Sequence, residues 1–153
     1  MLKKILIVLG ILAVIGIGVA IFFTNKFVGE VQQELQAREP ELRQYLTMTV
    51  EEQNAYVDKS WNDVVKGLIN KFGGQEISEA EYNATFSNET PELKAARIEY
   101  GRSVIAAIIL SMDNIVKDIP ADIKAKLQAE ADDTDNRSKK YQELEKQFSA
   151  NQK

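Results

Sequence analysis

The longest apolar stretch of the chain lies near its N-terminus. Residues 5–23 contain no charged and no polar side chain. As a helix this run is about 28 Å long, close to the roughly 30 Å hydrocarbon thickness of a bilayer. In lipid, a single segment can satisfy its own backbone N–H and C=O groups only as a helix. The pattern therefore predicts a single transmembrane helix, a membrane anchor over residues 5–23.

The flanks of this run predict its orientation. Lys3 and Lys4 crowd residues 1–4, whereas on the other side basic residues are sparse and lie among acidic ones. The positive-inside rule then puts residues 1–4 in the cytoplasm and the body across the membrane. We take this membrane to be a bacterial inner membrane, so that the body is periplasmic or extracellular. The alternative is a signal peptide cleaved after Ala20 and a secreted body. The apolar run continues past Ala20, which favours a retained signal anchor.

Small residues recur within the predicted anchor. Gly16 and Ala20 are four positions apart and share one face of a helix, as do the small-residue pairs that let two membrane helices approach closely. This interpretation predicts a homo-oligomer joined through the membrane helix. The alternative is that these residues have no partner helix, because glycine is common in membrane helices in general.

Beyond the anchor, apolar residues recur at helical spacing. Residues 24–40 are predicted to form a juxtamembrane stalk helix, which Pro40 ends because proline disfavours the helix before it. A short turn is expected to restart at residues 41–46. Thr49 and Glu52 then form a capping box, in which a hydroxyl and a carboxylate each bind a free backbone N–H. The helix that they open runs to Gly73, and its apolar stripe includes Val57, Trp61, Val64 and Leu68.

The strongest helix signal lies in the second half of the chain. At Thr90-Pro91-Glu92 a capping hydroxyl, a first-turn proline and an acidic residue follow one another. The helix is expected to run to about Lys117. Its middle, residues 104–110, is apolar on every side, which predicts the central helix of a bundle. Pro120 separates it from a further helix over residues 121–131.

Shorter elements complete the predicted fold. A second capping box at Ser78 opens a short helix to about Phe86, and the polar run 132–136 is expected to be a linker before the last helix, which carries Tyr141, Leu144 and Phe148. Residues 149–153 are expected to be a disordered tail. No stretch alternates with period two. The predicted fold class is all-α: a transmembrane helix followed by a four- to five-helix bundle over residues 41–148.

Composition narrows the chemistry. The 153 residues include no His and no Cys, which excludes His-ligated metals, Ser-His and Cys nucleophiles, thiolate zinc sites and disulfides. Residues 1–23 carry only Lys3 and Lys4, so 17 of the 19 basic side chains and all 23 acidic ones remain, a net charge of −6. An acidic body without a basic stripe argues against a nucleic-acid partner.

Candidate sites have structural alternatives. The run from Asp132 resembles the start of a calcium loop, but Arg137 stands where glycine makes the sharp turn, so a solvated linker is favoured. Trp61, the only Trp, is expected in the core. Three carboxylates could serve an enzyme, although helix capping also explains them: Glu76, Glu79 and Glu81. We therefore predict no catalytic residue, no metal ligand and no cofactor.

Together these patterns predict a membrane-anchored, non-enzymatic helical interaction module: an accessory, sensory or scaffold subunit with an exported domain. Its expected partners are the lipid bilayer and another protein. One alternative is an anchored inhibitor or immunity protein, whose acidic body neutralises a basic toxin or envelope hydrolase. A second alternative is a carboxylate-based cell-envelope enzyme.

Overall fold

The computed structural model describes residues 36–72, 78, 80 and 89–151. The predicted anchor at residues 5–23, with Gly16 and Ala20, lies outside these residues, as does most of the predicted stalk helix. Within the described residues, no helix has both the length and the apolar content needed to cross a bilayer.

The described residues form helices and no strand, which confirms the all-α fold class. The second capping box falls largely outside them. The helices of the described part are, in chain order, α3 (Glu39–Tyr45), α4 (Val50–Phe72), α6 (Pro91–Leu110), α7 (Asp113–Val116), α8 (Ala121–Asp132) and α9 (Thr134–Asn151).

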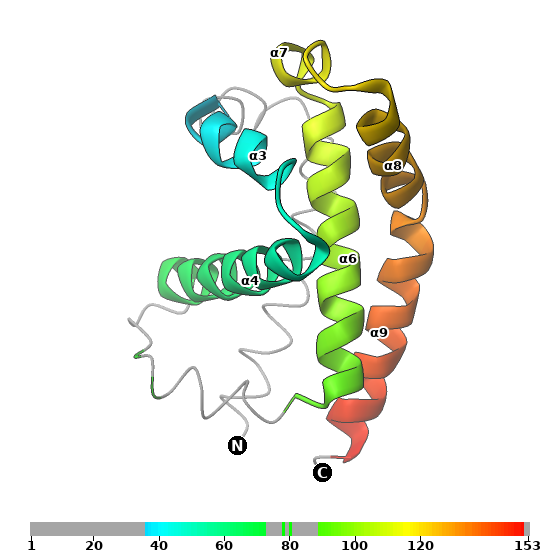
Figure 1. Cartoon of the computed structure of the whole chain (residues 1–153). Coiled ribbons are helices and arrows are strands. Elements are labelled where there is room, and N and C mark those ends of the chain that lie inside the picture. The colour runs from blue at the N-terminus through cyan, green and yellow to red at the C-terminus, as the bar shows by residue number, and fades with distance from the viewer. Residues whose placement is uncertain (1–35, 73–77, 79, 81–88, 152–153) are drawn as a thin grey trace.

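Helix α6 is the centre of the arrangement. It packs against α4, α7, α8 and α9, which confirms the prediction from its apolar middle. The chain turns back at α7, and α8 and α9 follow one another along α6 in the opposite direction (Figure 1). Helix α4 crosses α6, and α3 lies near the end of α6 that carries α7 (Figure 1).

The capping signals predicted at Thr49 and Thr90 form at the starts of α4 and α6, the two longest helices of the described part. The Thr49 N–H donates to Glu52 Oε2 at 2.8 Å, and the Glu52 N–H donates to Thr49 Oγ1 at 3.3 Å. At the start of α6, the Leu93 N–H donates to Thr90 Oγ1 at 3.1 Å. These side chains satisfy N–H groups that the first turn of a helix leaves free.

Two predicted helix ends differ in detail. Helical residues 36–37 end in a turn at Arg38, just before Pro40, and Pro40 itself lies in the first turn of α3, where its missing N–H costs no intrahelical hydrogen bond. Helix α6 ends at Leu110 and not near Lys117. Ser111 Oγ donates to the carbonyl of Ile108 at 2.6 Å, and Met112 is extended. No glycine or proline marks this turn; burial of Met112 at its corner stabilises it.

The prediction of a linker at residues 132–136 is also wrong. Asp133 alone separates α8 from α9. Its carboxylate accepts hydrogen bonds from Asn136 Nδ2 at 3.0 Å and from Arg137 Nε at 2.9 Å, while Thr134 Oγ1 donates to the Ala131 carbonyl at 2.7 Å. Local side-chain bonds thus let a polar run remain helical. Helix α9 then continues to Asn151, where the sequence predicts a disordered tail from residue 149.

The apolar side chains gather in two clusters. The first surrounds the α7 end of α6: Leu42, Tyr45, Val57, Ala106, Ile109, Met112, Ile115 and Leu127. The second joins the start of α6 to α9: Leu93, Ala96, Tyr100 and Tyr141, with Trp61, Leu144 and Phe148 packed against them. Between the two clusters α4 crosses α6 at Gly101, where an added Cβ would lie 2.5 Å from Val57 Cγ1.

Candidate functional site

The described residues contain two charged sites. The first is centred on Arg97 of α6 and lies where α4 crosses α6. The Arg97 side chain is only 7% exposed. Nε and Nη2 donate to the two carboxylate oxygens of Glu89, each at 2.8 Å, and Nη2 also donates to Asp58 Oδ1 of α4 at 2.7 Å. One guanidinium thus joins α4, α6 and the segment before α6.

The charges of this site stabilise one another. Burial alone would lower the pKa of Arg97, but its hydrogen bonds with Glu89 and Asp58 raise that pKa above the ordinary arginine value. Burial raises the pKa of Asp58, yet the hydrogen bonds from Arg97 and Lys94 hold it below the ordinary range. The pair therefore stays ionised near neutral pH and suits binding between helices better than proton transfer.

Aromatic rings pack beside Arg97. Its Cζ lies 5.9 Å from the centre of the Trp61 ring, a distance that permits cation–π attraction. Trp61 makes edge contacts with Tyr100 at 6.1 Å and with Tyr141 at 5.7 Å between ring centroids. Trp61, which was expected in the core, is partly buried and packs against the core cluster of α6 and α9. These contacts bring α4, α6 and α9 together at one point.

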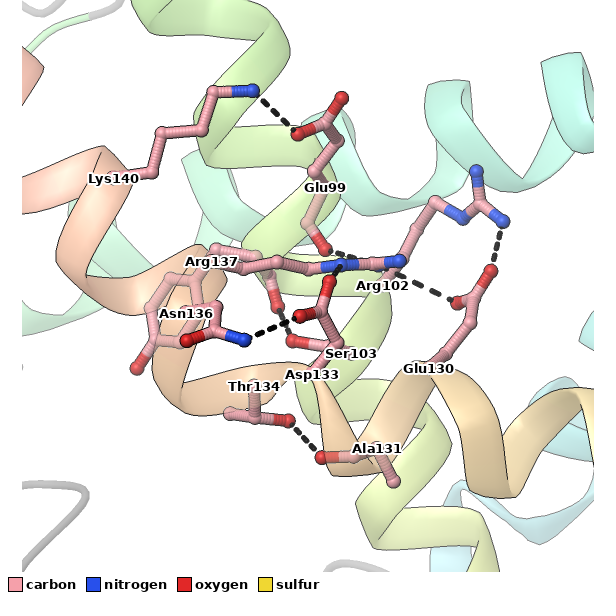
Figure 2. Close-up of polar contacts among 11 residues, drawn as sticks. Glu99, Arg102, Ser103, Glu130, Ala131, Asp133, Thr134, Asn136, Arg137 and Lys140 are labelled. Atoms are coloured by element: carbon pink, nitrogen blue, oxygen red, sulfur yellow. Dashed lines mark hydrogen bonds and ion pairs between the residues drawn. The ribbon is translucent and has the colours of Figure 1, made fainter.

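The second charged site lies where α8 passes into α9 (Figure 2). Arg102 of α6 pairs with Glu130 of α8. From α9, Arg137 Nη1 lies 3.9 Å from Glu130 Oε2 and donates to the Glu99 carbonyl of α6 at 2.9 Å. Lys140 Nζ lies 3.1 Å from Glu99 Oε2. Figure 2 shows how these side chains from three helices converge on the single-residue joint.

The run from Asp132 does not form the loop that calcium binding needs, because only Asp133 lies between α8 and α9. Arg137, at the position of the loop glycine, donates through Nε to Asp133 Oδ2. Across the described parts of the chain, no three His, Cys, Asp or Glu side chains gather closely enough to hold a metal ion. The paired charges explain Asp133 without a bound cation.

Two buried polar atoms, one on α6 and one on α3, lie beside this second site. The hydroxyl of Tyr45 and Nε of Arg102 are both buried without a hydrogen-bond partner. Burial, followed by the nearby charge of Glu130, raises the pKa of Tyr45 to about 12. Tyr45 is therefore neutral near pH 7 and cannot serve as a base there.

The three carboxylates singled out in the sequence, Glu76, Glu79 and Glu81, lie outside the described residues. The arginine sites were not foreseen, although one signal was present. Leu93, Ala96, Arg97 and Tyr100 follow the spacing of a single buried helix face. A charged residue on such a face requires a partner, because burying an unpaired charge is costly.

Comparisons with protein-family models, with curated proteins and with solved structures found no match to this chain. The geometry of the two charged sites therefore carries the functional argument. At the first site Arg97 joins carboxylates of α4 and of the segment before α6. At the second site Arg102 and Arg137 join a carboxylate of α8 and a carbonyl of α6. This arrangement fixes the shape of the helical unit.

Proposed function

We propose that the chain is a membrane-anchored, non-enzymatic helical interaction module, an accessory, sensory or scaffold subunit that holds a rigid helical body outside a bacterial inner membrane. The observation that carries this proposal is the pairing of one buried and two partly buried arginines. Arg97, Arg102 and Arg137 are each engaged with acidic or carbonyl groups of another element. Groups engaged in this way stabilise a scaffold and are poorly placed to act on a substrate.

The apolar run at residues 5–23 supports the membrane part of the proposal. Expression of the full chain in a bacterium, followed by alkaline carbonate extraction, tests it. We expect the wild type to stay in the membrane pellet and Val14→Arg to be lost from it, because an arginine at a helix centre opposes insertion by about 2.5–3.5 kcal/mol. Thr24→Arg, just past the run, is the control and should stay. A soluble mature chain that begins at Ile21 would contradict anchoring.

The proposed partner is another protein. Crosslinking in intact membranes, followed by purification of a stoichiometric complex, tests this part. Repeating the purification at increasing salt separates the main proposal from the inhibitor alternative: the acidic body would hold a basic partner through charges that salt screens. A measured turnover that disappears in Glu76→Ala, Glu79→Ala or Glu81→Ala would instead favour the carboxylate enzyme.

Pairing through the membrane helix remains part of the proposal. If Gly16 and Ala20 pack two copies together, Gly16→Ile and Ala20→Ile should reduce crosslinked dimers, because larger side chains keep the helix backbones apart. Val19→Ile, on a neighbouring face, is the matched control. Equal dimer yields from all of these variants would refute the pairing.

A further inference from the structure

Glu145 of α9 occupies an unusual position for a carboxylate. Tyr141, Leu144, Glu145 and Phe148 recur at the spacing of one helix face, and Tyr141, Leu144 and Phe148 belong to the apolar cluster that joins α9 to the start of α6. Glu145 itself is partly buried. A glutamate on a packed face normally has a cation as its partner.

The described neighbours of Glu145 supply no such cation. On its own helix, the Tyr141 hydroxyl donates to Glu145 Oε1 at 3.3 Å. Before α6, the carboxylate of Glu89 adds a second negative charge nearby. Arg97 of α6 pairs with Glu89 and with Asp58 of α4 through Nε and Nη2, and its Nη1 is buried without a hydrogen-bond partner. Lys94 pairs with Asp58. Among the described residues, no Lys or Arg forms an ion pair with Glu145.

This setting favours the neutral acid. Burial raises the pKa of Glu145 to about 7; the Tyr141 hydrogen bond opposes the rise, and Glu89 adds to it. The ordinary value is 4.5. When α9 leaves α6 the carboxyl returns toward that value, so the open form releases its proton first as the pH rises.

We propose that the end of α9, from Tyr141 to Asn151, is an acid-stabilised segment. It docks on α6 while Glu145 is protonated and detaches from α6 more readily once Glu145 is ionised. The sign follows from proton binding. Between about pH 4.5 and pH 7 the docked form holds more protons than the open form, so docking weakens as the pH rises. Above this window both forms are ionised and the dependence levels off.

The absence of histidine makes the proposal testable. Histidine is the side chain whose ordinary pKa falls in this window, and the chain has none to obscure the titration of Glu145. The measurement is hydrogen exchange of the backbone amides at residues 141–151 in the full-length chain, held in a nonionic detergent. Comparing Glu145→Gln with the wild type at each pH cancels the intrinsic pH dependence of exchange. Glu143→Gln, an exposed position on the same helix, is the matched control.

At pH 7.5 we expect wild-type amides in this segment to exchange about ten- to a hundredfold faster than those of Glu145→Gln. This estimate lies below the full effect of the pKa change, because water partly screens Glu145. At pH 5 the two should agree to within a few-fold, and Glu143→Gln should match the wild type at both pH values. Equal exchange in wild type and Glu145→Gln at pH 7.5 would overturn the proposal. Membrane anchoring can fail its own test without affecting this result.

Discussion

Arg97 and Arg43 make similar contacts in very different surroundings. Arg97, at the α4–α6 crossing, is 7% exposed and binds Glu89 and Asp58. Arg43, on α3, is 39% exposed; it binds Glu39 at 2.9 Å, Asp118 at 3.2 Å and the Asn114 carbonyl of α7 at 2.9 Å. The number of bonds is nearly equal. The difference teaches that solvent, and not the count of contacts, decides how much a guanidinium stabilises the fold.

The sharpest way to break this comparison is Arg97→Met. It keeps most of the side-chain volume but leaves the Glu89 carboxylate, 19% exposed, without its guanidinium. We expect a loss of about 3–5 kcal/mol in the free energy of unfolding, as for other broken buried pairs. Urea unfolding followed by helical circular dichroism measures it. Lys94→Met removes the other partner of Asp58, is 51% exposed, and should cost less than about 1 kcal/mol. Equal losses would contradict the role of burial.

Gly101→Ala tests the packing at the same crossing. Alanine favours a helix by about 1 kcal/mol over glycine, but here the new Cβ would meet Val57 Cγ1 at 2.5 Å. We expect a net destabilisation of about 1–3 kcal/mol from overpacking. The double variant Gly101→Ala with Val57→Ala removes the clash, so its loss should be smaller than the sum of the two single losses. Additive losses would show that α4 and α6 adjust without strain.

Asp58 gives the stability of the α4–α6 crossing a pH dependence opposite in sign to that which Glu145 gives the end of α9. Its pKa is lowered in the folded protein, because the hydrogen bonds from Arg97 and Lys94 outweigh the effect of burial. Its contribution to stability is therefore complete above the ordinary value of 3.8 and is lost as the pH falls through the lower folded value. Thermal unfolding of the wild type and Asp58→Asn should differ most near neutral pH and converge in acid. A constant difference would contradict this linkage.

The smallest effect should come from Arg43→Ala. Arg43 and its partner Asp118 are exposed and Glu39 is partly exposed, and salt screens exposed charges. We expect a slight loss of stability in low salt that disappears in high salt, measured by thermal unfolding at the two ionic strengths. Gln44→Ala, exposed on the same helix, controls for a change in helix propensity. A large, salt-independent loss would place Arg43 with Arg97 and remove the contrast.

Local signals in the sequence predicted much of the fold. The capping residues at Thr49 and Thr90 fix the starts of α4 and α6 because their partners are only three residues away. The break after Leu110 and the joint at Asp133 could not be predicted in the same way. The first depends on burying Met112 in a cluster with residues distant in sequence. The second depends on the bond from Arg137 to Asp133, whereas the polar composition of residues 132–136 predicted a linker.

The charged sites, too, could be predicted from local sequence only in part. Arg97 pairs with Asp58, 39 residues away, and no local pattern specifies such a partner. The positions of Arg97 and Glu145 were nevertheless visible, because each falls on an apolar helix face. Sequence spacing can thus identify a charge that needs an explanation. Only the packing of α4 and α9 on α6 shows which of the two has a partner of opposite charge: Arg97 binds Asp58 and Glu89, whereas Glu145 forms no ion pair with a described residue.

The single-residue joint at Asp133 has a mechanical consequence. Helices α8 and α9 follow one another with no loop between them (Figure 1), so residues 121–151 amount to a strut of about 45 Å at 1.5 Å per residue. Arg137 braces this strut to α6 at the Glu99 carbonyl, near its middle. A displacement of the α7 end would therefore be transmitted along the continuous α8–α9 helices toward the end of α9, with the contact between Arg137 and α6 as the pivot.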